Sequence, residues 1–139
     1  MKHRLHLPPG ERRRLAELTA KGYPAETCGL LLGTVVDGDR RVEHAIAGRN
    51  RNRERARDRY ELDPLDHLRA EEEARRAGLA VVGVWHSHPD RPALPSETDR
   101  LAAWAGWSYL IAAVDAGGLQ ALRSFRIAEG TFVEEEIVE

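Results

Sequence analysis

The sequence feature that most constrains the fold is an unbroken apolar run at residues 79–85, which leads directly into the sequence HSHP. An apolar run of this length is typical of a strand that is buried on both faces of a sheet. Side chains two positions apart on an extended chain point to the same side, so His86 and His88 should converge on one point. Trp85 should then face the opposite side and pack in the core. Pro89 cannot donate a backbone hydrogen bond to a neighbouring strand and should end the run.

Shorter patterns along the chain predict strands and helices in alternation. Apolar periodicity with Pro or Gly at the ends predicts three helices, at residues 11–21, 64–76 and 97–105. Alternating or continuous apolar runs between turn residues predict further strands at residues 3–7, 28–36, 41–47, 60–62, 108–114, 119–127 and 131–138. This mixture predicts an α/β or α+β fold, with a mixed β-sheet packed by helices.

Length and composition limit the classes of protein to consider. The chain has 139 residues, a usual size for a single domain, so we expect one domain over residues 1–139. Its 21 basic and 23 acidic residues nearly balance, which gives no reason to expect a nucleic-acid partner. No apolar segment reaches the length of a membrane span or a signal peptide. The single cysteine, Cys28, rules out an internal disulfide, and we expect a cytoplasmic protein.

The segment HSHPDRPALPSETD carries the residues of a metal site. Two imidazoles, from His86 and His88, and one carboxylate, from Asp99 in the first turn of the next helix, form a familiar catalytic zinc set that leaves a fourth position for water. Hydrolysis also needs a group that accepts the proton of the water, and Glu26, just before an apolar strand, is the candidate. Ser96 has a hydroxyl that could stabilise an oxyanion. The sequence alone does not show that Glu26 is near the histidines.

This spacing resembles the JAMM motif of the MPN family of metalloproteases. The motif has His86-x-His88, seven residues, Ser96, two residues and Asp99, together with the upstream Glu26, and all five positions match. The surrounding sequences PAETCG and HP are also similar to those of the small bacterial members. The resemblance covers nearly the whole chain.

The resemblance implies a role for each of these residues. His86, His88 and Asp99 would hold one Zn²⁺ ion per chain, Glu26 would act as general base and then general acid, and Ser96 would stabilise the tetrahedral oxyanion. It also implies a fold similar to cytidine deaminase, with a mixed sheet between helices. The substrate would be a ubiquitin-like or sulfur-carrier protein, cleaved after its C-terminal Gly-Gly.

Other functions and simpler explanations stay open on the sequence. Some MPN domains are non-catalytic protein-binding modules, although the five intact positions argue against that here. A zinc-dependent deaminase on a similar fold would need a Pro-Cys-x-x-Cys pair, which a chain with one cysteine lacks. Ser96 and Asp99 also have the spacing of a helix-capping pair.

Three further features have simple structural explanations, and Arg91 has a functional one. Cys28 should pack as a small apolar residue, and Trp104 and Trp107 should lie in the core or at its edge. Arginines at every odd position of residues 49–59 are expected to form a solvated segment, with a docking surface for an acidic partner as the alternative. Arg91, between the predicted ligands, could contact a substrate.

Overall fold

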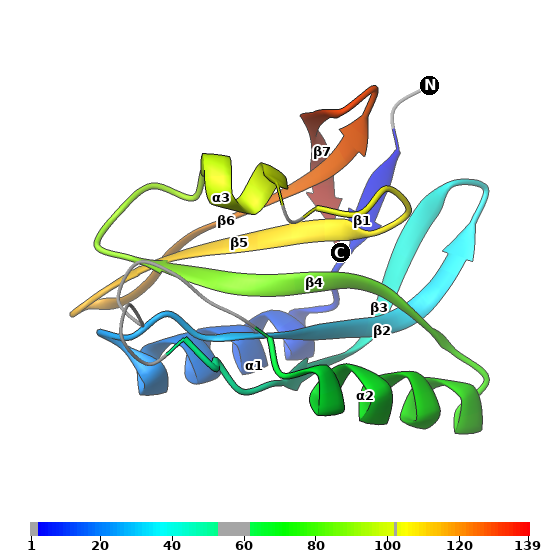
Figure 1. Cartoon of the computed structure of the whole chain (residues 1–139), viewed down its shortest axis with the longest axis horizontal. Coiled ribbons are helices and arrows are strands. Elements are labelled where there is room, and N and C mark those ends of the chain that lie inside the picture. The colour runs from blue at the N-terminus through cyan, green and yellow to red at the C-terminus, as the bar shows by residue number, and fades with distance from the viewer. Residues whose placement is uncertain (1–2, 53–61, 102) are drawn as a thin grey trace.

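The structure is a computed structural model that describes residues 3–52, 62–101 and 103–139. Its elements follow the order β1 (Arg4–His6), α1 (Pro9–Gly22), β2 (Cys28–Val36), β3 (Asp39–Ala47), α2 (Pro64–Arg76), β4 (Ala80–Pro89), α3 (Glu97–Leu101), β5 (Ser108–Asp115), β6 (Gly118–Ala128) and β7 (Thr131–Val138) (Figure 1).

The strands form one sheet that closes on itself in the order β1-β3-β2-β4-β5-β6-β7. The short strand β1 closes it by pairing in parallel with both β3 and β7. At the centre, β4 pairs antiparallel with β2 and parallel with β5. The last three strands form a meander of two antiparallel hairpin pairs. The predicted mixed sheet is therefore confirmed.

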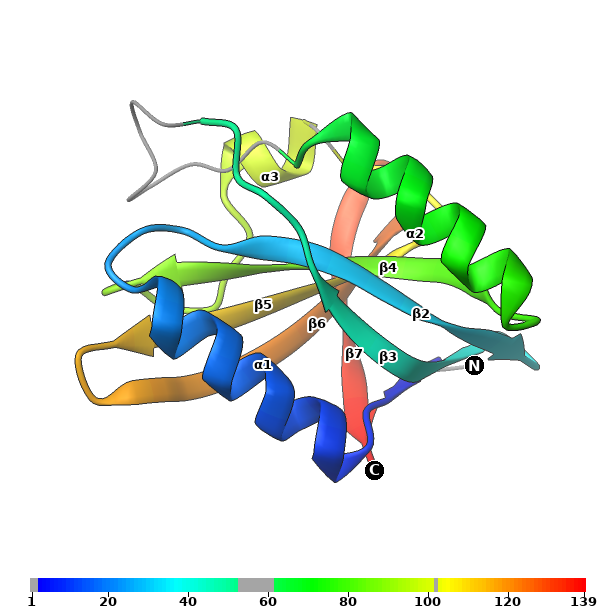
Figure 2. The ribbon, with the colours of Figure 1, turned by 90° about the horizontal axis from the view of Figure 1, so that it is seen from below.

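The two long helices cover opposite faces of this sheet (Figure 2). On one face, Leu31 of β2 packs in a cluster with Leu15 of α1. On the other face, Leu30 packs in a cluster with Ala70 and Ala74 of α2. Successive residues of β2 therefore pack against different helices. Because both faces of the strand are buried, its residues are apolar without alternation, as in the run at residues 28–36. This arrangement confirms the predicted α+β class, while the finer likeness to cytidine deaminase and the single-domain boundary stay predictions. Among the described residues, no helix is both long and apolar enough to cross a bilayer.

The central strand ends where the sequence predicts. It runs from the apolar residues through both histidines to Pro89, and β5 pairs with it in parallel over its whole second half. One predicted boundary in the segment with the metal-site residues is wrong. The helix predicted at residues 97–105 ends at Leu101. Beyond it, the backbone N–H of Trp104 donates to the hydroxyl of Tyr109 and Gly106 has a φ of 102°, so the chain turns into β5. Residues 60 and 61 of the short strand predicted at 60–62 lie outside the described residues.

The contact of Trp85 with β2 fixes how β4 lies in the sheet. Trp85 belongs to the buried cluster of α1, on the face opposite the histidines, as predicted. Its indole Nε1 donates to the carbonyl oxygen of Ile46 at 2.9 Å. Gly29, the register partner of Trp85, has no side chain that would block this close approach.

We expect Gly29→Ala to destabilise the protein by about 1–3 kcal/mol, because extra volume in a packed core forces neighbours to move. An added Cβ would lie 2.0 Å from the carbonyl oxygen of Ile46 and 2.5 Å from Trp85 Nε1. Urea-induced unfolding would measure the change. Gly10→Ala is the matched control, since its Cβ would meet only Arg13 Nη2 at 3.8 Å. The control should be neutral or stabilising by up to about 1 kcal/mol. Equal stabilities of the two variants would contradict this account of Trp85.

Candidate metal centre and active site

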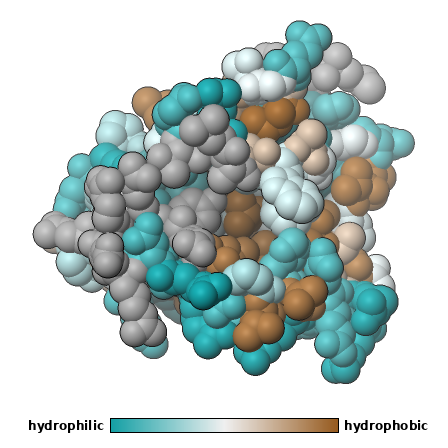
Figure 3. Space-filling model, in the orientation of Figure 1, coloured by the Kyte–Doolittle hydropathy of each residue, from teal (hydrophilic) through white to brown (hydrophobic). Residues whose placement is uncertain are grey.

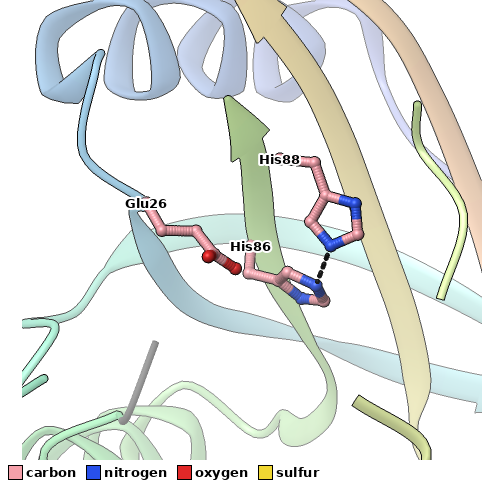
Figure 4. A group of neighbouring side chains, drawn as sticks. All are labelled: Glu26, His86 and His88. Carbon is pink, nitrogen blue, oxygen red and sulfur yellow. Dashed lines mark hydrogen bonds between the residues drawn. The ribbon is translucent and has the colours of Figure 1, made fainter. Parts of the chain in front are cut away.

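Both histidines of the HSHP sequence lie inside β4 and point to the same side. Their backbones are held extended by β5, where His86 pairs with Ile111 and His88 with Ala113. Both side chains are buried, and their Nε2 atoms are 3.1 Å apart (Figure 4). The period of an extended chain therefore brings the two imidazoles to one point, as the sequence predicts.

The orientation of the His88 ring is fixed by a backbone carbonyl. His88 Nδ1 lies 2.9 Å from the carbonyl oxygen of Pro92. A carbonyl oxygen only accepts hydrogen bonds, so Nδ1 carries the proton and donates it. In the neutral imidazole this leaves the lone pair on Nε2, which faces His86. A hydrogen bond of this kind typically orients histidines that bind metals.

Asp99 meets both imidazoles from the short helix α3. Its Oδ2 atom is 3.3 Å from His86 Nε2 and 3.3 Å from His88 Nε2. The same oxygen accepts the backbone N–H of Ser96 at 2.8 Å, and Ser96 Oγ accepts the backbone N–H of Asp99 at 3.0 Å. Ser96 and Asp99 thus form the reciprocal capping pair that the sequence allowed, and this cap positions the Asp99 carboxylate.

The protonation of these groups suits metal binding. Burial alone would raise the pKa of Asp99, but the neighbouring imidazoles of His86 and His88 and the hydrogen bond from the Ser96 backbone hold the pKa well below its ordinary value. Burial lowers the pKa of His86, although the Asp99 carboxylate opposes this effect. Asp99 is therefore ionised and His86 neutral at neutral pH, which are the forms that bind a metal ion.

The spacing of these three atoms matches the edges of a zinc tetrahedron. Zinc bonds to imidazole nitrogen and carboxylate oxygen are about 2.0–2.1 Å long, so two ligands of a tetrahedral ion lie about 3.3 Å apart. The Nε2 atoms of His86 and His88 and Oδ2 of Asp99 are 3.1, 3.3 and 3.3 Å from one another. The residues therefore fit a small tetrahedral cation without rearrangement.

Glu26 approaches the histidines from the segment that precedes β2. Glu26 is only 2% exposed, and its carboxylate points toward His86 (Figure 4). This segment is joined to β4 through Ser87, whose backbone N–H donates to the carbonyl of Thr27 at 2.9 Å and whose Oγ accepts the backbone N–H of Thr27 at 2.8 Å. Asn50 Nδ2 also donates to the carbonyl of Glu26 at 3.0 Å.

Two carboxylates thus flank the pair of imidazoles, and their partners differ. A carboxylate oxygen of Glu26 and one nitrogen from each histidine all lie within 4.8 Å of one another, so Glu26 is also close enough to be a ligand. However, Glu26 Oε2 accepts a hydrogen bond from Arg91 Nη2 at 3.0 Å. Asp99 Oδ2 instead lies at tetrahedral spacing from both imidazoles, which favours Asp99 as the third ligand and Glu26 as a neighbouring base.

The structure also tests the residues for which the sequence suggested no catalytic role. Cys28 is buried, as predicted, and burial together with the negative charges of Glu26 and Asp66 raises the pKa of its thiol to about 12. Trp107 is half-buried against the α2 cluster, but Trp104 is 65% exposed and stacks on Trp107, so the prediction of a core position is wrong for Trp104. It is wrong because α3 ends early and leaves Trp104 on the surface turn.

The arginine-rich segment is described only in part. Residues 53–59 lie outside the described residues, so its suggested docking role stays untested. Its first arginine, Arg49, forms ion pairs with Asp63 at 3.1 Å and Asp66 at 3.2 Å at the start of α2. These contacts hold the beginning of the segment beside α2.

Sequence reasoning missed the residues that bring Glu26 to the histidines. Asn50, Ser87 and Thr27 act through hydrogen bonds that involve the backbone, and no residue pattern distinguishes them from other polar residues. The one available signal is that Ser87 lies between the two histidines, so its side chain must face the opposite side of β4.

Comparison with known proteins now identifies the family. A family model described as prokaryotic homologs of the JAB domain matches residues 8–128, a span that includes all five motif positions. The chain belongs to this prokaryotic JAB-domain family. The resemblance to small JAMM/MPN proteins is thereby confirmed.

Two named relatives match more than half of this chain. The chain is 41% identical to a desampylase of Haloferax volcanii over 93 residues, which span 66% of this chain and 65% of that protein. It is 32% identical to the CysO-cysteine peptidase of Mycobacterium tuberculosis over 118 residues, which span 84% of this chain and 78% of that protein. The matched region thus spans just under two thirds of the desampylase.

Solved structures share the fold of this chain. A protein from Desulfitobacterium hafniense, whose structure was determined in solution, superimposes with a TM-score of 0.86 and 31% identity over 96% of this chain and 91% of that chain. A JAB1/MPN domain protein from Archaeoglobus fulgidus superimposes with a TM-score of 0.54 and 21% identity over 100% of both chains, which shows the shared fold.

We expect zinc to stabilise the metal-free protein by about 2.7 kcal/mol when free zinc is 100-fold above its dissociation constant. His88→Ala should abolish this gain, because it removes one corner of the ligand triangle. Thermal unfolding with and without zinc would measure the effect. His44→Ala is a matched control, since His44 is exposed on β3, and it should keep the full gain. Zinc stabilisation that survives His88→Ala would contradict this ligand set.

Proposed function

We propose that this protein is a zinc-dependent peptidase or isopeptidase that hydrolyses the bond after the C-terminal Gly-Gly of a ubiquitin-like or sulfur-carrier protein. The observation that carries the proposal is the ligand triangle of His86, His88 and Asp99 with the buried carboxylate of Glu26 beside it. The names of relatives support the substrate class: one is a CysO-cysteine peptidase, and another, from Thermus thermophilus, is a probable TtuB-protein conjugate cleaving protease.

In this proposal His86, His88 and Asp99 hold the Zn²⁺ ion. When bound, zinc supplies a Lewis acid that polarises the scissile carbonyl and lowers the pKa of a water molecule to about 7. The protein contributes the neutral and ionised forms of these ligands, which burial and the capping pair of Ser96 and Asp99 maintain.

Glu26 carries the proton between the two halves of the reaction. Hydrolysis breaks the C–N bond, adds a hydroxyl to the carbonyl carbon and delivers a proton to the leaving nitrogen. An ionised Glu26 accepts the proton of the attacking water and then donates it to that nitrogen. The ion pair with Arg91 fixes the position of the Glu26 carboxylate beside the histidines.

Ser96 is positioned for a second role besides capping α3. Its Oγ atom accepts the backbone N–H of Asp99, and a serine hydroxyl also has a proton to donate. We propose that it donates this proton to the oxyanion that develops on the scissile carbonyl.

The face that carries α2 and α3 offers contacts for a protein substrate. Figure 3 shows apolar side chains among polar ones on this face. The exposed apolar side chains of these elements and their loops include Leu65, Leu68, Leu94 and Trp104. Such side chains can bind the surface of a folded carrier protein while its tail reaches the metal centre.

The direct test measures zinc content and cleavage on one preparation. We expect about one zinc per chain and release of the extension from a sulfur-carrier protein lengthened beyond its Gly-Gly, with activity lost in chelator and restored by zinc. Zinc binding without cleavage of any such carrier would reject the substrate class. Absence of zinc after reconstitution would instead favour a non-catalytic MPN-type binding module.

The role of Glu26 is tested by separating zinc binding from turnover. Glu26→Ala should keep zinc but lower kcat by about 10²- to 10⁴-fold, the usual effect of losing a general base. Glu17→Ala, a change on the surface of α1, is the control and should keep both zinc and activity. Retained turnover in Glu26→Ala would reject Glu26 as the base.

The two roles of Ser96 predict different losses. Removing a helix cap costs about 1 kcal/mol of stability, whereas removing an oxyanion donor lowers kcat by about 10²- to 10³-fold. We expect Ser96→Ala to show both effects in parallel unfolding and kinetic measurements. A stability loss with unchanged kcat would leave Ser96 with its capping role alone.

A further inference from the structure

Arg91 lies in the loop between the ligand strand β4 and the ligand helix α3, and this loop is anchored on both sides of it. On one side, Asp90 accepts hydrogen bonds from the hydroxyl of Tyr23 at 2.8 Å, and its backbone N–H donates to the carbonyl of Val114 at 2.8 Å. On the other side, the carbonyl of Pro92 accepts from His88 Nδ1. The position of the Arg91 backbone is therefore tied to the metal centre.

The Arg91 side chain reaches both Glu26 and solvent. Its Nη2 atom donates to Glu26 Oε2 at 3.0 Å, while 32% of the side chain is exposed. A guanidinium has five N–H donors in a planar fork, which matches the two oxygens of a carboxylate. Arg91 can therefore contact a substrate group that lies next to Glu26.

The chemistry of the reaction defines which substrate group lies there. Glu26 delivers a proton to the leaving nitrogen, so that nitrogen must come within hydrogen-bond distance of Glu26. In an α-amino acid the carboxylate carbon is two bonds from the nitrogen, which places it about 2.5 Å away. A leaving group that is a single amino acid thus puts its free carboxylate beside the guanidinium of Arg91.

We propose that Arg91 binds the free α-carboxylate of a single amino acid that follows the Gly-Gly, and so selects a C-terminally extended carrier over an isopeptide conjugate. This inference rests on the proposed function and adds to it a preference for one kind of leaving group. Without a cation, that carboxylate would meet the negative charges of Glu26 and Asp99. In an isopeptide the leaving nitrogen is at the end of a lysine side chain, six bonds from its own carbonyl carbon, which is an amide within the target protein. Such a leaving group gains nothing from Arg91.

The test compares two matched substrates with the zinc-loaded full-length chain. Both are the same carrier protein with one amino acid after Gly-Gly, one ending in a free carboxylate and the other in a carboxamide. We expect kcat/KM to be about 10- to 100-fold higher for the carboxylate form, as a charge-assisted pair would give. Arg91→Gln should remove this preference, mainly by raising KM for the carboxylate form, and Arg91→Lys should restore part of it. Binding of the free amino acid and of its amide, measured as product inhibition, should show the same preference and the same loss.

Arg76→Gln is the matched control. Arg76 pairs with Glu72 at 2.6 Å on the surface of α2, so its loss should leave the preference unchanged. A wild-type preference near one, or an equal loss on both substrates in Arg91→Gln, would overturn the inference and leave Arg91 only as the partner of Glu26. Failure of the wild type to cleave either substrate would instead reject the proposed function itself.

Discussion

The pairing of β4 with its two neighbours is the constraint on which the site depends. Because β5 holds residues 86–88 extended, both imidazoles leave β4 on the same side, and Trp85 and Ser87 leave it on the other. Ser87 then binds the segment before β2, which carries Glu26. A single strand thus positions the two proposed histidine ligands on one face and, through its other face, the proposed base Glu26.

Burial gives this site its chemical character. Two carboxylates and two imidazoles lie together with little exposure to water, an arrangement that would be costly unless every charge has a partner. Asp99 is held ionised by the imidazoles and its capping bond to Ser96, and Glu26 is held by Arg91. A divalent cation in the ligand triangle would complete this balance. The apolar sheet around the site limits the access of bulk water and strengthens each of these interactions.

The loop from Asp90 to Ser96 contacts both the metal-site residues and Glu26. It connects the ligand strand to the ligand helix, orients His88 through the Pro92 carbonyl and brings Arg91 to the base. Changes in this short loop can therefore alter which leaving group is accepted while the metal ligands stay in place. In the proposed site, leaving-group specificity and metal binding are carried by neighbouring but different residues.

The sequence by itself determined most of the secondary structure and the residue types of the candidate site. The apolar run before HSHP predicted the central strand, and its two-residue period predicted that His86 and His88 converge while Trp85 packs behind them. The family motif added Ser96, Asp99 and Glu26. These features are local, or are fixed by a spacing that can be read along the chain.

Only the tertiary structure decided how the distant parts meet. The approach of Glu26 to the histidines depends on the hydrogen bond that Asn50 donates to the Glu26 carbonyl and on the one that Ser87 accepts from the Thr27 backbone, and both partners lie far from Glu26 in the sequence. The ion pair of Arg91 with Glu26 joins residues 65 positions apart, and the exposure of Trp104 follows from the early end of α3. These features arise from strand pairing and from the paths of loops in space, which a one-dimensional pattern of polar and apolar residues does not specify.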